Sequence, residues 1–70
     1  MRKKILSAIL EIIKKEGYIL LSRNVFFAHA IWYDSDQQKG FLAINPGTRP
    51  LDDCSDRELK IISHDLKLDF

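Results

Sequence analysis

The segment from Val25 to Tyr33 constrains the fold of this 70-residue chain most strongly, because it is rich in aromatic and apolar residues. Such a composition predicts a long β-strand, whose side chains alternate between two faces. One face would carry Val25, Phe27, His29, Ile31 and Tyr33, and the other Phe26, Ala28, Ala30 and Trp32. Both sets are largely apolar, so a single layer of helices would leave one apolar face open.

An amphipathic helix is predicted before this strand, over residues 2–16. Apolar residues recur there at helical spacing over an arc of about 200°, and polar side chains fill the remainder. Gly17 is well placed to end the helix, because glycine readily adopts the left-handed conformation of a C-terminal cap. The arc is wider than one sheet face usually covers, so we expect the second helix or another subunit to pack beside it.

Two shorter strands flank the long one. The predicted pattern is strands at residues 18–21, 25–33 and 41–44, with a turn at 22–24 and a polar loop at 34–40. Asn45, Pro46 and Gly47 would end the pairing, and the following segment, which contains Pro50, would cross the surface irregularly.

A second helix is predicted to begin after Ser55. Ser55 and Glu58 have the spacing of a capping box, in which each side chain accepts a hydrogen bond from the other residue's backbone. Leu59, Ile62 and Leu66 then mark one apolar helical face. We therefore predict an α+β fold in one domain spanning residues 1–70. Its order is helix, three antiparallel strands and helix (αβββα), with both helices on one sheet face.

Several functional classes are disfavoured by composition. No apolar run reaches the roughly 18 residues of a membrane span, so we expect a soluble, cytoplasmic protein without membrane contact. Cys54 is the only cysteine, which leaves no internal disulfide and no cysteine pair for zinc. His29 and His64 lie in no recognisable catalytic pattern, and Asp34 with Asp36 lacks the rest of a calcium loop. We expect no cofactor, no metal and no enzymatic activity.

A protein-interaction surface is the leading functional hypothesis. If the even-numbered residues of the long strand face the helices, then Phe27, His29, Ile31 and Tyr33 form an exposed apolar surface. The opposite assignment of the two faces stays open. In either case we expect a protein partner or a second copy of the chain, as in a dimer, to cover the exposed face.

The charge distribution supports an alternative hypothesis of RNA binding. Net charge is only +1, but residues 1–33 carry six basic and two acidic side chains, and residues 34–70 carry five and eight. The basic side chains of the predicted first helix and following turn could contact phosphates: Lys3, Lys4, Lys14, Lys15 and Arg23. Glu11 and Glu16 interrupt this set, and no aromatic residue lies within it for base stacking.

The predicted order resembles the double-stranded-RNA-binding domain and the HicA-type toxins, which are small RNA-targeting proteins with that fold. Residues 12–18, Ile-Ile-Lys-Lys-Glu-Gly-Tyr, are similar to the helix end and Gly-aromatic step of the toxins. Residues 47–51 and 59–70 are similar to their final loop and helix. The resemblance implies the αβββα layout and contact with RNA.

Two departures limit what the resemblance implies. Arg23-Asn24-Val25 stands where the toxins carry a Gly-Ser-His step, so no catalytic residue is carried over. Acidic residues, Asp52, Asp53 and Asp56, stand where the RNA-binding module places lysines at its last helix. The resemblance therefore concerns the fold, from which function does not follow.

Overall fold

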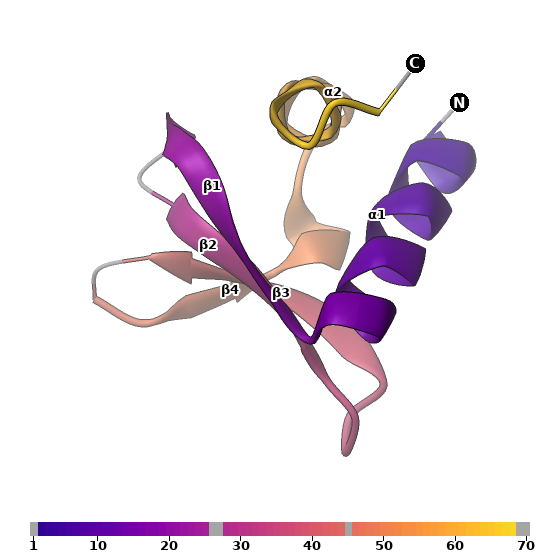
Figure 1. Cartoon of the computed structure of the whole chain (residues 1–70), viewed down its shortest axis with the longest axis vertical. Helices are drawn as coiled ribbons and strands as arrows, with labels where there is room; N and C mark the ends of the chain where they lie inside the picture. The colour runs from indigo at the N-terminus through magenta and orange to yellow at the C-terminus, as the bar shows by residue number, and fades with distance from the viewer. Residues whose placement is uncertain (1, 26–27, 45, 69–70) are drawn as a thin grey trace.

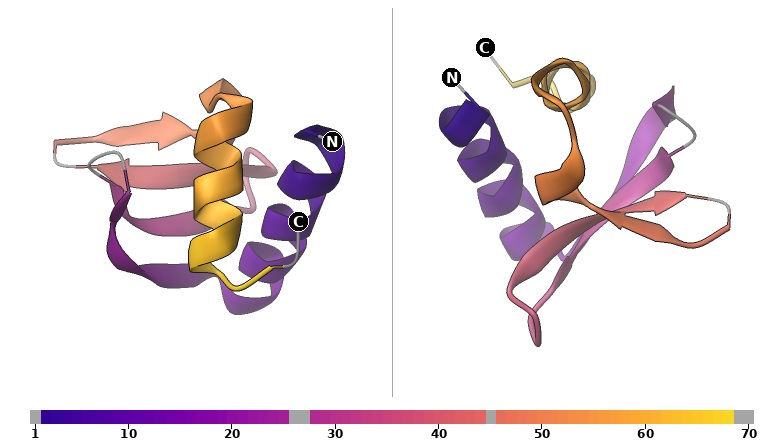
Figure 2. Two further views of the ribbon diagram at one scale, coloured as in Figure 1. Left: turned by 90° about the horizontal axis from the view of Figure 1, so that it is seen from above. Right: turned by 180° about the vertical axis from the view of Figure 1, so that it is seen from behind.

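The computed structural model describes residues 2–25, 28–44 and 46–68. Its elements are α1 (Arg2–Glu16), β1 (Tyr18–Val25), β2 (Ala28–Asp34), β3 (Lys39–Ile44), β4 (Thr48–Pro50), the 3-10 helix η1 (Leu51–Asp53) and α2 (Asp56–Asp65). The strands form one antiparallel sheet in the order β1-β2-β3-β4. Both helices pack against the same face of this sheet, and α2 crosses over the strands (Figures 1 and 2). The predicted helix-sheet-helix order is confirmed.

Helix α1 begins and ends as its sequence pattern predicts. Ile5, Ile9 and Ile13 recur every four residues and are fully buried against the sheet and α2. Gly17 ends the helix with a φ of 81°, and its N–H donates to the carbonyl of Ile13 at 2.6 Å. The left-handed conformation costs glycine little, so the chain can turn directly from α1 into β1.

The sheet has a fourth strand, so the prediction of three strands is wrong in this detail. Gly47, with a φ of 97°, turns the chain back, and the N–H of Ile44 donates to the Gly47 carbonyl at 3.0 Å. Along the antiparallel strands β3 and β4, residue pairs that exchange backbone hydrogen bonds alternate with pairs that do not. Pro50 lies opposite Phe41 in a pair that exchanges no backbone hydrogen bond. The missing N–H of Pro50 therefore costs nothing, and proline is compatible with this edge strand.

Strand β1 is longer than predicted. It runs from Tyr18 to Val25, so the predicted turn at residues 22–24 is wrong, and Val25 pairs with Ala28 of β2. Phe26 and Phe27, which were assigned to the long strand, lie outside the described residues. The prediction failed because Ser, Arg and Asn are typical of turns, whereas here they continue a strand whose register with β2 shifts between Leu20 and Val25.

A bulge in β2 decides which of its side chains face the helices. Ala28 pairs with Ile44 and Ala30 with Ala43, so β2 carries one extra residue between these pairs. The extra residue reverses the alternation of side chains. Ala28 and Ile31 consequently lie together in the core, although one is even-numbered and the other odd-numbered.

The core lies between the helices and one sheet face. It contains Ile5, Ile9, Ile13, Leu21, Ala28, Ile31, Leu42, Leu51, Cys54, Leu59 and Ile62. Gly40 of β3 points into this layer, because a Cβ atom there would lie 2.5 Å from Leu51 Cδ1 and 2.8 Å from Ile13 Cδ1. The absence of a side chain lets α1 and η1 approach the sheet closely.

Helix α2 starts with the predicted capping box. The Glu58 N–H donates to Ser55 Oγ at 3.1 Å, and the Ser55 N–H donates to Glu58 Oε1 at 2.8 Å. Two N–H groups that the helix cannot pair internally are thereby satisfied. Neither α1 nor α2, the helices within the described ranges, has the length and apolar character needed to cross a bilayer.

Candidate functional site

The sheet face turned away from the helices carries an aligned row of large side chains. Residues in register across the four strands are Tyr18, Trp32, Phe41 and Pro50. The neighbouring row consists of Leu20, Ala30, Ala43 and Thr48. Ile31 and Leu42, which lie between these rows along their strands, belong to the core, so both rows occupy the opposite face. We call this surface the open face.

The centre of the open face is packed against itself. The rings of Trp32 and Phe41 stack with their centroids 4.9 Å apart and their planes inclined by 21°. Phe41 is therefore only 8% exposed, although no helix covers it. Stacking of this kind stabilises neighbouring strands and reduces the apolar area left for a partner.

Exposed apolar surface is concentrated on β1. Tyr18 is 54% exposed and Leu20 is 67% exposed, and they are the large hydrophobic residues exposed within the described part of the chain. They lie two residues apart and so project from the same face of the strand. Sequence analysis missed both, because every residue from Tyr18 to Leu21 is apolar and the pattern does not say which face is covered.

Strand β1 is also an edge of the sheet. The N–H of Tyr33 donates to the Gly17 carbonyl at 3.0 Å, which fixes the alternation of hydrogen bonds between β1 and β2. In this register the N–H and C=O groups of Tyr18 and Leu20 point away from β2. The next outward N–H, that of Ser22, donates to a carboxylate oxygen of Asp65 at 2.9 Å, and Ser22 Oγ bonds the other oxygen. The end of α2 thus occupies the edge at Ser22.

The open face carries little net charge. Asp34 and Lys39 are cross-strand partners in the row beyond Tyr33 and Gly40, and they have opposite charges. The cationic Arg49 lies on the other face, where it bonds Glu58. A neutral apolar surface suits a protein partner better than a polyanion.

The predicted partner-binding set is divided by the structure. Ile31 is 0% exposed and lies in the core, and Tyr33 packs partly buried against it, so neither forms the open face. The assignment of Ile31 and Tyr33 to an exposed surface is therefore corrected in favour of the opposite assignment of the two faces, and the bulge in β2 explains why Ala28 still lies in the core with Ile31. His29 is exposed on β2, and Phe27 lies outside the described residues.

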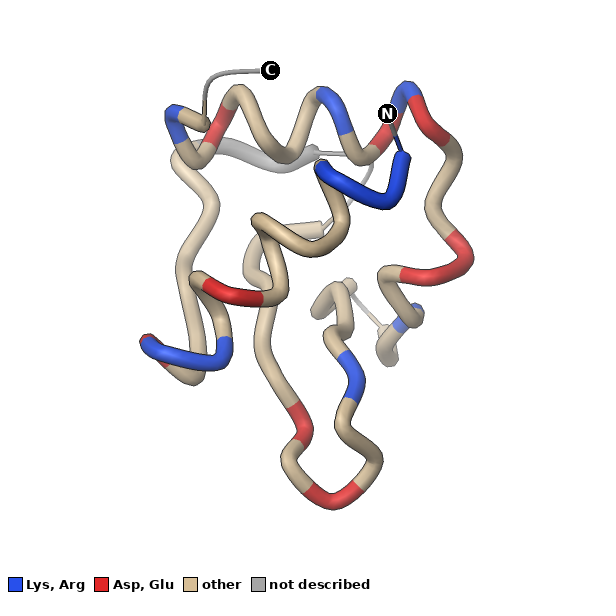
Figure 3. The backbone as a smooth tube through the Cα atoms, turned by 90° about the vertical axis from the view of Figure 1, so that its right-hand side faces the viewer, with Lys and Arg blue, Asp and Glu red and all other residues tan. Residues whose placement is uncertain are grey.

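The predicted nucleic-acid-binding lysines lie at the two ends of α1 (Figure 3). Lys3, Lys4, Lys14 and Lys15 are all exposed. The ammonium group of Lys14 lies 5.6 Å from the centre of the Tyr33 ring, where a cation–π interaction attracts it. Glu11 lies between the two pairs, and the side chain of Arg23 is outside the described part. The lysines therefore form two separate pairs on one helix.

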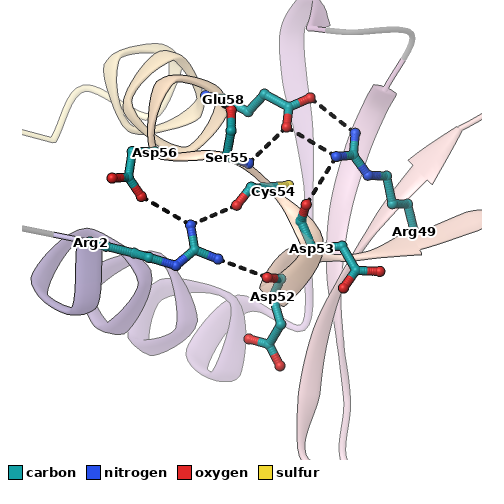
Figure 4. Close-up of polar contacts among 8 residues, drawn as sticks. All are labelled: Arg2, Arg49, Asp52, Asp53, Cys54, Ser55, Asp56 and Glu58. Atoms are coloured by element: carbon teal, nitrogen blue, oxygen red, sulfur yellow. Dashed lines mark hydrogen bonds and ion pairs between the residues drawn. The ribbon is translucent and has the colours of Figure 1, made fainter.

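The side chain of Arg2, next to Lys3 and Lys4, binds within the protein. Arg2 donates to the carbonyl oxygens of Cys54 at 2.6 Å and Asp52 at 2.7 Å, and forms an ion pair with Asp56 at 3.2 Å (Figure 4). The start of α1 is thereby fastened to the segment before α2. Three hydrogen-bonding partners hold this guanidinium, so it is poorly placed to bind a phosphate.

Chemically reactive groups do not gather at one place within the described residues. Across residues 2–25, 28–44 and 46–68, no group of three His, Cys, Asp or Glu residues could hold a metal ion. Cys54 is buried, and burial raises the pKa of its thiol, which keeps the sulfur protonated and unreactive. The surface with the clearest distinguishing property is therefore the open face together with the edge of β1.

Comparison of the chain with protein-family models, with curated proteins and with solved structures gave no match. The case for a function consequently depends on the physical properties of these surfaces.

Proposed function

We propose that this protein is a small non-enzymatic interaction module that binds another protein through the open face of its sheet. One observation carries the proposal: Tyr18 and Leu20, two residues apart on β1, are 54% and 67% exposed. Burying a large apolar side chain contributes about 1.5–3 kcal/mol, so a partner that covers both gains a substantial part of a binding free energy. A regulator or inhibitor of a larger complex would work in this way.

The neighbouring features support a protein as the partner. Trp32 continues the apolar surface inward from Tyr18, and its stacking on the largely buried Phe41 holds it in a fixed geometry. Rigid aromatic side chains at the centre of a patch are typical of protein interfaces, since little conformational entropy is lost on binding. Asp34 and Lys39 bring opposite charges to the rim of the patch.

The test is retention of partners from a lysate of the source cells by tagged protein at low and high salt. We expect the parent chain to retain a protein that resists high salt, and Tyr18→Thr with Leu20→Thr to lose it, because threonine suits a strand but removes apolar area. Lys3→Gln with Lys4→Gln, also exposed changes, is the matched control and should retain it. Equal retention by the Tyr18/Leu20 double variant would contradict the proposal.

RNA binding is the second candidate, supported by the four exposed lysines of α1. Lys3 and Lys14, like Lys4 and Lys15, are 11 positions apart in this helix. At 1.5 Å per residue, that spacing is about 16 Å along one face. Two basic pairs at this distance could contact separate phosphates. We expect affinity to fall steeply with salt and to be abolished by Lys14→Glu with Lys15→Glu. Unchanged RNA binding by this variant would exclude the basic face.

A further inference from the structure

We propose that the β1 edge pairs antiparallel with the β1 edge of a second copy, so that two four-stranded sheets join into one. This inference rests on the proposed function, because it names a second copy as an occupant of the same exposed region. Antiparallel pairing of identical edges is generated by a two-fold axis, which gives a closed dimer.

On its outer side, β1 pairs with no strand of the described part of the chain. The N–H and C=O groups of Tyr18 and Leu20 point out of the sheet. Among the described residues no further strand lies beside them, so β1 forms an outer edge of the sheet (Figure 2). An extended chain matches the spacing of such a row of alternating donors and acceptors, as in β-strand addition. The partner at this edge is therefore a strand.

The two edges of the sheet differ in how well they are protected against pairing. Strand β4 has only three residues, with Arg49 and Pro50 among them, and these are common protections against pairing between sheets. Residues 18–21 of β1 are Tyr, Ile, Leu and Leu, with neither charge nor proline. Asp65 blocks β1 only from Ser22 onward. The unprotected stretch is thus limited to one side of the molecule and to a few residues.

Residues 18–21 of β1 are complementary to the same residues of a second copy. If Ile19 lies on the two-fold axis, then Tyr18 of each copy is opposite Leu20 of the other copy. Both residues direct their backbone groups outward, so each pair exchanges two hydrogen bonds. Their side chains share the open face, so the two large apolar residues exposed in the described part of each copy cover those of the other. No charged side chain of residues 18–21 opposes another, so pairing costs no repulsion.

The expected assembly is reversible, because the pairing segment is short. A stable interface buries at least about 1,000 Å², more than a few residues per copy supply. We therefore expect monomer and dimer to exchange in solution, with the dimer increasing at high protein concentration.

A backbone modification tests this pairing without altering any side chain. Chemical synthesis of the chain with N-methyl-Leu20 removes one outward donor per copy and places a methyl group where the second strand would lie. We expect the dimer dissociation constant, measured by sedimentation equilibrium, to rise roughly tenfold or more. N-methyl-Thr48 is the matched control: the Thr48 N–H also points out of the sheet, at the β4 edge, and its methylation should leave dimerisation unchanged.

Intermolecular nuclear Overhauser effects give a second measurement that does not depend on a variant. In a mixture of isotope-labelled and unlabelled chains, we expect contacts between Tyr18 of one copy and Leu20 of the other. A chain that remains monomeric up to millimolar concentration, equal dimerisation of the N-methyl-Leu20 chain, or contacts only between other residues would overturn the pairing.

The same samples separate this inference from the proposed function. A monomeric chain that still retains a lysate protein through Tyr18 and Leu20 would overturn the dimer and leave the interaction module standing. A dimer that contains the Tyr18–Leu20 contact but retains no other protein would support the pairing. It would also reduce the proposed function to self-association.

Discussion

Two hydrogen bonds of 3.0 Å join the guanidinium of Arg49 to the carboxylate of Glu58, and they tie β4 to the first turn of α2. The same carboxylate accepts the Ser55 N–H of the capping box at 2.8 Å (Figure 4). Arg49 also donates to the Asp53 carbonyl at 3.1 Å. One glutamate thus serves both the helix start and the attachment of the edge strand. The bonds from Arg49, followed by that from Ser55, lower its pKa from 4.5 to about 2.

The low pKa of Glu58 predicts a dependence of stability on pH. A carboxylate whose pKa is depressed in the folded state stabilises the fold above its unfolded pKa, and this stabilisation disappears as the pH falls through the folded value. We expect Glu58→Gln to lower the free energy of unfolding by about 1–2 kcal/mol at neutral pH. The difference from the parent should shrink between pH 4.5 and about 2.

Urea unfolding at a series of pH values checks this prediction. Glu11→Gln makes the same chemical change at an exposed position of α1 and should shift stability by less than about 0.5 kcal/mol. A constant difference between the Glu58→Gln variant and the parent down to pH 2 would contradict the role assigned to the carboxylate.

Arg2 is predicted to stabilise the fold rather than to bind nucleic acid. Arg2→Gln removes the hydrogen bonds to the carbonyl oxygens of Cys54 and Asp52. We expect the free energy of unfolding to fall by about 1–2 kcal/mol, mainly because these oxygens lose a charged donor. The ion pair with Asp56 is exposed and contributes little. Thermal unfolding measures the loss. Lys3→Gln, at the neighbouring exposed position, should leave the free energy of unfolding nearly unchanged. Equal losses in the two variants would contradict a stabilising role of the Arg2 hydrogen bonds.

A side chain at position 40 is predicted to destabilise the core. A methyl group there would lie 2.5 Å from Leu51 Cδ1 and 2.8 Å from Ile13 Cδ1, so Gly40→Ala must displace the core. We expect a loss of about 1–3 kcal/mol from overpacking. Gly47→Ala is the comparison, since nothing lies within 4 Å of its Cβ position and the cost there arises from its φ of 97°. Chemical denaturation compares the two. Adding Leu51→Val should recover stability only in the Gly40→Ala background, and its failure to do so would exclude the proposed clash.

The two faces of the sheet are predicted to respond oppositely to substitution. Ile31 is fully buried, so Ile31→Ala should cost about 2–5 kcal/mol and unfold much of the protein. Leu20 is largely exposed, so Leu20→Thr should change stability by no more than about 0.5 kcal/mol. Circular dichroism during thermal unfolding distinguishes these outcomes. Similar losses at both positions would mean that the open face is covered within the monomer.

Local signals in the sequence determined where α1 ends and where α2 begins. Gly17 ends α1, and Ser55 with Glu58 starts α2, because each of these signals acts through hydrogen bonds within a few residues. The isoleucines of α1 likewise predicted its buried face, since helical spacing alone places them on one side. These features depend on neighbouring residues and can be predicted without knowing the rest of the fold.

Only the tertiary structure decided how β2 presents its faces and where the sheet ends. A one-residue bulge near His29 reverses the alternation, which places Ile31 in the core and Trp32 on the open face. The pairing of Thr48–Pro50 with β3 adds a strand despite its proline. Strand register and strand pairing depend on contacts between residues far apart in the chain, so the alternation of side chains along a single strand cannot reveal them. For the same reason, the exposure of Tyr18 and Leu20 emerged only once both helices were seen to cover the opposite face.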